Sequence, residues 1–136
     1  MSSVIRVAVE NIAPLWSQVE PLVIDGMRDV PTHTAEDVRL LLISHRCHLW
    51  IQWDEHRVEA IVITEFAVYP RGIWLRMWII AARRDAKIDD DLFFNALEEW
   101  RLANGCRGYE GCGRHGWLRR LKMVKMEGLV VRVTYE

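Results

Sequence analysis

The chain has 136 residues, of which 51% are hydrophobic and 27% are charged. This is the composition of a globular protein with its own core, and it excludes a disordered chain or a fibre. The 18 lysines and arginines and the 19 aspartates and glutamates leave a net charge of −1. That balance argues against a protein that mainly binds a nucleic-acid backbone. We therefore expect one domain over residues 1–136 and no nucleic-acid partner.

Apolar runs and cysteines indicate the compartment. No apolar run approaches the roughly 20 residues that span a bilayer, and the first ten residues hold no stretch of signal-peptide length. Three cysteines, an odd number, fit a reducing environment better than a disulfide framework. The expectation is a cytoplasmic protein without membrane contact.

The N-terminal third predicts one short strand followed by two helices. Apolar residues recur within the first ten positions and favour a strand. Asn11 can cap a helix that tolerates Pro14 in its first turn, and apolar residues follow at helical spacing up to Val23. Thr34 begins a second helix, and Asp37 three residues later suits the positive end of its dipole.

The middle of the chain predicts a three-stranded meander. Its strands are rich in Val, Ile, Phe and Trp and cover residues 49–53, 57–69 and 73–81, with turns at 54–55 and 70–72. The second of these is apolar on both alternations over most of its length. This pattern predicts a central strand that is covered on both faces.

The C-terminal third predicts a helix over 89–104, opened by three aspartates and ended by Asn-Gly. A brief strand at 106–110, a short basic helix at 114–122 and a last strand at 129–135 follow. The whole order is β-α-α-β-β-β-α-β-α-β. It predicts an α/β (α+β) domain with a mixed, mostly antiparallel sheet flanked by helices.

That order of elements resembles the GNAT (N-acetyltransferase) superfamily over nearly the whole chain. The segment GYEGCGRHGWLRRLKMVKMEGLVV, residues 108–131, is similar to the closing strand–helix–strand unit of phage-encoded GNAT-like proteins. In those proteins a Gly-Arg-x-Gly-Trp run precedes a basic helix, and small internal virion proteins of short-tailed phages have comparable size. The resemblance implies that the N-terminus of the helix 89–104 faces the pyrophosphate of coenzyme A.

The sequence departs from the family where the coenzyme binds. Active members carry glycines whose backbone N–H groups close on the pyrophosphate, whereas residues 81–91 here read AARRDAKIDDD. Three aspartates stand where an anion would dock, and only Arg83, Arg84 and Lys87 could hold it as side-chain clamps. The family's tyrosine on the last helix is also missing, because no tyrosine lies between Tyr109 and Tyr135.

Three residues are candidates for acid–base chemistry: Glu65, Tyr109 and His115. Glu65 lies in an apolar strand, where burial would raise its pKa toward that of a useful general base. The alternative is that Glu65 pairs with an arginine such as Arg76 on the neighbouring strand. Tyr109 and His115 flank the coenzyme side that the resemblance implies and could carry protons, although a histidine between Arg114 and Gly116 is often a surface or capping residue.

Histidines and cysteines do not predict a metal site. His45, Cys47 and His48 crowd together, and Cys106 and Cys112 lie further along the chain. Neither set has the spacing of a structural zinc site. Buried thiols are the simpler interpretation of the last two cysteines.

Seven tryptophans are the most unusual feature of the composition. Large aromatic rings anchor many interfaces, although most of the tryptophans in one domain fill its core. The basic run that ends the chain could touch nucleic acid, but a solvated helix face is the plainer interpretation. The candidate interface residues are Trp50, Trp53, Trp117, Arg119 and Arg120.

Three hypotheses follow. The first is a non-catalytic GNAT-like phage or prophage protein without a cofactor, which contacts phage structural or assembly proteins in the host cytoplasm or the virion. The second is a divergent acetyl-CoA-dependent N-acetyltransferase with an open cleft between the fourth and fifth strands. The first predicts that a side chain such as Trp78 or Tyr109 fills this cleft. A third is a modifier or inhibitor that binds a host protein.

Overall fold

The computed structural model describes residues 2–28 and 32–111. The helix predicted at 114–122 and the strand predicted at 129–135 lie outside these ranges. In chain order the elements are β1 (Ser3–Arg6), a 3-10 turn η1 (Val9–Asn11), α1 (Ile12–Gly26), α2 (Ala35–Ile43), β2 (His48–Trp53), β3 (Val58–Tyr69), β4 (Gly72–Ala82), α3 (Asp90–Ala103) and β5 (Tyr109–Gly111). None of the helices in the described ranges has the length and hydropathy needed to cross a membrane.

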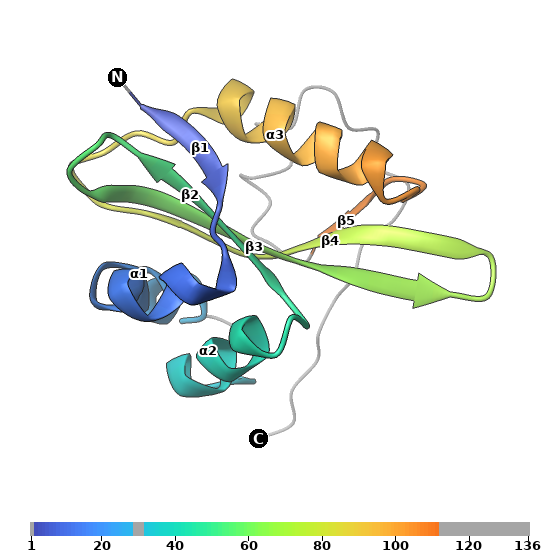
Figure 1. The fold of residues 1–136 in the computed structure, drawn as a ribbon, viewed down its shortest axis with the longest axis horizontal. Coiled ribbons are helices and arrows are strands. Elements are labelled where there is room, and N and C mark those ends of the chain that lie inside the picture. The colour runs from blue at the N-terminus through green and yellow to red at the C-terminus, as the bar shows by residue number, and fades with distance from the viewer. Residues whose placement is uncertain (1, 29–31, 112–136) are drawn as a thin grey trace.

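The strands form one sheet in the order β1-β2-β3-β4-β5. The first four are antiparallel neighbours, and β5 joins β4 in parallel. Helices α1 and α2 cover one face of the sheet and α3 covers the other, as Figure 1 shows. The predicted α/β domain with a mixed, mostly antiparallel sheet flanked by helices is confirmed.

Two hydrophobic cores lie on the two faces of the sheet. Ile61 and Ile63 of β3 pack toward α1 and α2, while the alternate residues Ala60 and Val62 pack toward α3. All four side chains are buried. The prediction of a central strand covered on both faces is therefore confirmed.

The helix starts agree with the sequence at two of three positions. Thr34 accepts a hydrogen bond from the Asp37 N–H, and Asp37 accepts one from the Thr34 N–H, which completes a capping box. Asp89 caps α3 by accepting from the Leu92 N–H. The side chain of Asn11 makes no capping hydrogen bond, because the turn η1 already places this residue in a helical conformation instead of the extended one that a cap requires.

Candidate functional site

A β-bulge in β4 marks the centre of the sheet. Ile63 of β3 pairs with Ile79, but the next residue, Thr64, pairs with Met77, so Trp78 is the extra residue of β4. An extra residue exchanges the two faces of a strand. The odd-numbered side chains of β4 therefore point toward α3 before Trp78 and toward α1 and α2 after it.

The side chains of β4 follow this exchange. Before the bulge, Leu75 and Met77 pack into the core under α3. After it, Ile79 and Ala81 pack into the core under α1 and α2. Both pairs have odd residue numbers, so a regular strand would have kept them on one face.

The bulge directly follows the described pairing between β4 and β5. The register of these strands runs from Leu75 opposite Tyr109 to Met77 opposite Gly111. Within the described residues, no strand pairs with the outer edge of β4 beyond this point. From Trp78 to Ala82 the outer edge of β4 thus has no strand partner among the residues that the structure describes.

The backbone of β4 beyond the bulge offers hydrogen-bonding groups at that edge. The Arg83 N–H donates to the Glu59 carbonyl on the β3 side at 2.8 Å. Because successive residues of a strand alternate their hydrogen-bonding direction, the N–H and C=O groups of Ile80 and Ala82 face away from β3. An extended ligand with amide groups could pair with them as an added strand would.

The loop of residues 83–89 connects this edge to the N-terminus of α3. Its first half is held by charge, since Asp85 accepts hydrogen bonds from Arg57 at 2.8 Å and from Arg83 at 3.2 Å. Its second half is held by Gln52, which bonds the backbone of Lys87 and Asp89. Ile88 between them is buried in the core under α3.

The charged groups of this loop have different partners. Arg83 is engaged with Asp85, whereas the exposed side chains of Arg84 and Lys87 form no ion pair with any described residue. At the start of α3 the Asp89 carboxylate takes the Leu92 N–H at 3.1 Å. One of the amides that an anion would use at a helix N-terminus is therefore already occupied.

An ionic cluster lies beside the last β4–β5 pair. Arg76 of β4 donates to Glu65 of β3 at 2.7 Å and to Glu110 of β5 at 2.8 Å. Tyr69 donates its hydroxyl proton to the other oxygen of Glu110 at 2.7 Å. These charged residues alternate with core residues that face α3, so the cluster lies on the face of α1 and α2.

The hydrogen bonds of the cluster decide its protonation. Burial opposes the charge on Glu110, but the bonds from Tyr69 and Arg76 outweigh it and lower the pKa of that carboxyl. Burial likewise opposes the charge on Arg76, yet its bonds to Glu110 and Glu65 raise the pKa of the guanidinium. For Glu65 the alternative drawn from the sequence, an ion pair with Arg76, is confirmed.

Tyr109 is engaged on the opposite face of the sheet. It donates its hydroxyl proton to Glu98 of α3 at 2.6 Å. Burial, followed by this bond to a carboxylate, raises the pKa of Tyr109. Trp78 packs toward α1 and α2 and lies edge-on to the His33 ring. The two rings therefore occupy opposite faces of the sheet instead of meeting at the edge of β4.

The predicted interface residues divide between the core and the part not described. Trp50 is only 4% exposed and donates its indole N–H to Thr64 at 3.0 Å. This burial corrects the prediction that Trp50 faces a partner. Trp53 is half-buried against the core under α1 and α2. His115 and the remaining interface candidates, Trp117, Arg119 and Arg120, lie outside the described residues.

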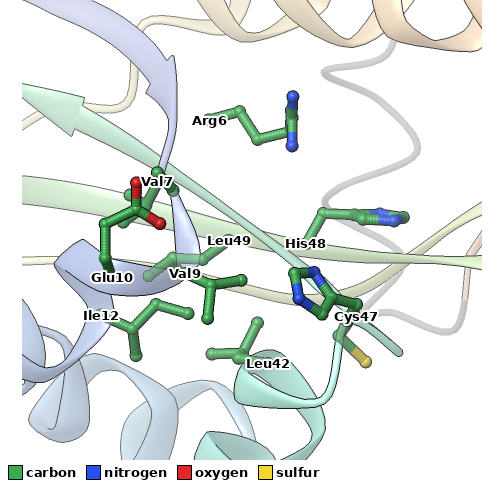
Figure 2. A pocket seen from close by; sticks show the side chains of 11 residues that line it. Arg6, Val7, Val9, Glu10, Ile12, Leu42, Cys47, His48 and Leu49 are labelled. Atoms are coloured by element: carbon green, nitrogen blue, oxygen red, sulfur yellow. The ribbon is translucent and has the colours of Figure 1, made fainter.

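A pocket of about 240 Å³ lies where β1 leads into α1, lined in part by His45, Cys47 and His48. In Figure 2 the Cys47 sulfur and the His48 ring point in different directions from adjacent positions, as expected for residues entering a strand. Burial raises the pKa of the Cys47 thiol to about 12. The residues that the structure describes contain no group able to hold a metal ion.

Two residues of the site were not found from the sequence. Gln52 is a polar residue in an apolar strand, which is the signal that could have drawn attention to it. Glu110 lies in a strand that the sequence predicts, but nothing local shows that it meets Arg76, which is 34 positions earlier.

The fold is that of the GNAT-like acetyltransferases. The chain is similar to an aminoglycoside acetyltransferase from an uncultured soil metagenomic sample, with a TM-score of 0.73, 14% identity and 99% and 95% of the two chains covered. It is also similar to a ribosomal-protein-alanine N-acetyltransferase from Brucella melitensis biovar Abortus 2308 (0.72, 8%, both chains covered at 100%). A predicted acetyltransferase with acetyl-CoA from Clostridium acetobutylicum gives 0.69 and 12%, with 97% and 96% covered. No protein-family model and no curated protein matches the sequence.

Proposed function

We propose that the protein is a divergent N-acetyltransferase that uses acetyl-CoA. The observation that carries the proposal is the bulge at Trp78, after which β4 leads through the loop of residues 83–89 to the N-terminus of α3. The similar structures support it, because they are named as acetyltransferases and cover nearly the whole of both chains. One of them is named as a complex with acetyl-CoA.

The residues at this edge fit the coenzyme in two ways. The outward backbone groups of Ile80 and Ala82 suit the amides of a pantetheine arm. The exposed cationic side chains of Arg84 and Lys87 suit the diphosphate, in place of a glycine-rich backbone cradle. Bound acetyl-CoA would supply the acetyl group as a thioester, whose C–S bond breaks as a C–N bond forms to the acceptor amine.

The ionic cluster gives this proposal an acceptor side. Glu65 and Glu110 place two carboxylates on the face of α1 and α2, close to the bulge of β4. A single guanidinium, that of Arg76, lies between them. Their negative charge would attract a cationic amine toward the bulge of β4, and the amine must lose a proton before it attacks.

A second candidate is a GNAT-like domain that has lost coenzyme binding and acts through protein contacts. The observation that favours it is the start of α3, where Asp89 caps the Leu92 N–H and Asp90 and Asp91 add negative charge. Contact with phage structural or assembly proteins belongs to this candidate.

Thermal unfolding with acetyl-CoA separates the two candidates. A ligand at a hundredfold excess over its Kd stabilises the folded state by about 2.7 kcal/mol, which raises the melting temperature measurably. We expect a saturable rise with acetyl-CoA. The double variant Arg84→Ala/Lys87→Ala should lose most of it. Arg71→Ala removes an exposed arginine at the β3–β4 turn and should keep it.

The contrary result is equally clear. A melting temperature that does not change up to millimolar acetyl-CoA would contradict the proposal. It would favour the second candidate, a domain that acts through protein contacts. If binding is found, release of free thiol in the presence of small amines and peptide N-termini then tests acetyl transfer directly.

A further inference from the structure

Gln52 is a buried polar residue whose side-chain hydrogen bonds join β2 to β3 and to the loop of residues 83–89. It belongs to β2, and its side chain is 2% exposed. Its amide nitrogen donates to the Lys87 carbonyl at 2.9 Å, and its amide oxygen accepts from the Asp89 N–H at 2.7 Å. The nitrogen also reaches the Glu59 carboxylate at 3.4 Å. A buried amide is stable only when such partners are present.

The two backbone groups that Gln52 binds lie on either side of Ile88. A strand residue bonds its neighbour in the same way, through one C=O and one N–H that flank a single side chain. The Gln52 amide therefore replaces a strand at this point and fixes both sides of Ile88. The side chain of Ile88 fills the core under α3, so the loop is held by packing and by hydrogen bonds together.

This contact determines where α3 begins. Asp89, whose N–H is held by Gln52, is also the residue whose carboxylate caps α3. Lys87, two residues before Asp89, has its carbonyl held by Gln52 and carries an exposed cationic side chain. The position of both features thus depends on one side chain that comes from a strand two places away from β4.

We propose that Gln52 is a positioning residue for the diphosphate of the coenzyme, an inference that rests on the proposed function. Gln52 does not touch the diphosphate. It sets the backbone from Lys87 to Asp89, and with it the Lys87 side chain and the first turn of α3. A loop without glycine has no backbone cradle of its own, so its anion site depends on the shape that Gln52 imposes.

The test compares two glutamines that each bond a backbone group. Gln52→Met keeps the length of the side chain and removes its hydrogen bonds. The control is Gln18→Met, because Gln18 accepts from the Val58 N–H at 2.8 Å and lies on α1, which covers the face of the sheet opposite α3 (Figure 1). The affinities for acetyl-CoA and for acetyl-pantetheine, which lacks the diphosphate, are measured by calorimetry for each variant.

We expect Gln52→Met to weaken acetyl-CoA binding about tenfold or more, and to leave acetyl-pantetheine binding within about twofold, a split that loss of stability alone would not produce. Gln18→Met should change neither. Equal loss for both ligands, or no loss for acetyl-CoA, would overturn the inference.

A second variant tests the donor on Gln52. In Gln52→Glu the ionised side chain cannot donate to the Lys87 carbonyl, and it lies beside the Glu59 carboxylate. The protonated acid can donate to that carbonyl and still accept from the Asp89 N–H. The acetyl-CoA affinity of this variant should therefore recover as the pH falls from 8 to 6, relative to the wild type over the same range. No relative recovery would count against the inference.

Amide exchange separates this inference from the proposed function. If the wild type binds no acetyl-CoA, the proposed function fails, and the coenzyme part of the inference fails with it. The structural part is then decided by hydrogen exchange at the Asp89 amide. Faster exchange in Gln52→Met than in Gln18→Met supports it, and equal exchange overturns it.

Discussion

Glu65 and Arg76 lie directly opposite each other in the β3–β4 register, and an Arg76 nitrogen donates to a Glu65 oxygen at 2.7 Å. The same guanidinium bonds Glu110 on β5. One cation therefore ties three strands together, two residues before the bulge at Trp78. From the sequence alone, Glu65 is a candidate general base. In the structure it forms an ion pair with Arg76 that holds neighbouring strands of the site together.

Replacing Arg76 should expose this role. Arg76→Met leaves Glu65 and Glu110 close together without a cation. Because water partly screens these half-buried groups, we expect a loss of about 1 kcal/mol in the free energy of unfolding at pH 7. The lowered pKa of Glu110 gives stability that is present above its ordinary value of 4.5 and lost below it. The difference from the wild type should therefore shrink toward pH 4.

Urea unfolding at both pH values measures this effect. Arg39→Met is the matched control, since Arg39 pairs with Glu36 on the surface of α2 and should change stability little. Equal losses of stability in the two variants would show that the ion pairs of Arg76 stabilise the fold no more than a surface ion pair does.

The two predicted N-caps give a second test. Thr34→Ala removes the hydroxyl that accepts from the Asp37 N–H, and should cost about 1 kcal/mol of stability. Asn11→Ala should leave stability unchanged, because the Asn11 side chain caps nothing. Thermal unfolding of both variants decides it, and a larger loss for Asn11 would contradict the structure.

Most of the fold could be predicted because its signals are local. The strand predicted over 57–69 is found at Val58–Tyr69, and the helix predicted over 89–104 is found at Asp90–Ala103. Apolar period, turn residues and an acidic helix start are readable in a short window of sequence. The cap predicted at Asn11 is wrong, because an asparagine that caps a helix and one that lies in a helical turn before it have the same sequence pattern.

The geometry of the site could not be predicted, because it depends on contacts between distant segments. Apart from Arg76, strand β4 has no charged or polar side chain on either alternation, so the exchange of faces at Trp78 leaves no trace in the sequence pattern. For the same reason the sequence predicts Trp50 as an interface residue. In the structure it is covered by α3, which begins 40 positions later in the chain. The Gln52 contact joins positions 35 and 37 residues apart.

A third prediction concerns the hydroxyl of Thr64, which is fully buried. It accepts from the Trp50 indole N–H at 3.0 Å and shares a second hydrogen bond with His48 Nδ1, also at 3.0 Å. Thr64→Val keeps the shape but leaves both groups without a partner, so we expect a loss of about 1–3 kcal/mol. Thr64→Ser keeps the hydroxyl and should lose less. The order of the two variants in urea unfolding is the result to check.

The last prediction follows from the neutral state of His48. Its ring lies among Phe66 and Trp100, and burial, followed by the charge of Arg6, lowers its pKa from 6.5 to about 4. The unfolded chain therefore binds a proton at this residue between pH 6.5 and 4 that the folded protein does not bind. Stability must fall as the pH falls through this window, by about 1–2 kcal/mol from His48.

Carboxylates also titrate near the acid end of that range, so a variant must isolate the histidine. His48→Asn keeps an acceptor for the Thr64 hydroxyl and cannot take up the proton. Its free energy of unfolding, measured at several pH values from 7 to 4.5, should decline less steeply than that of the wild type. Parallel curves would mean that the pKa of His48 is the same in the folded and the unfolded protein, which would contradict the lowered pKa.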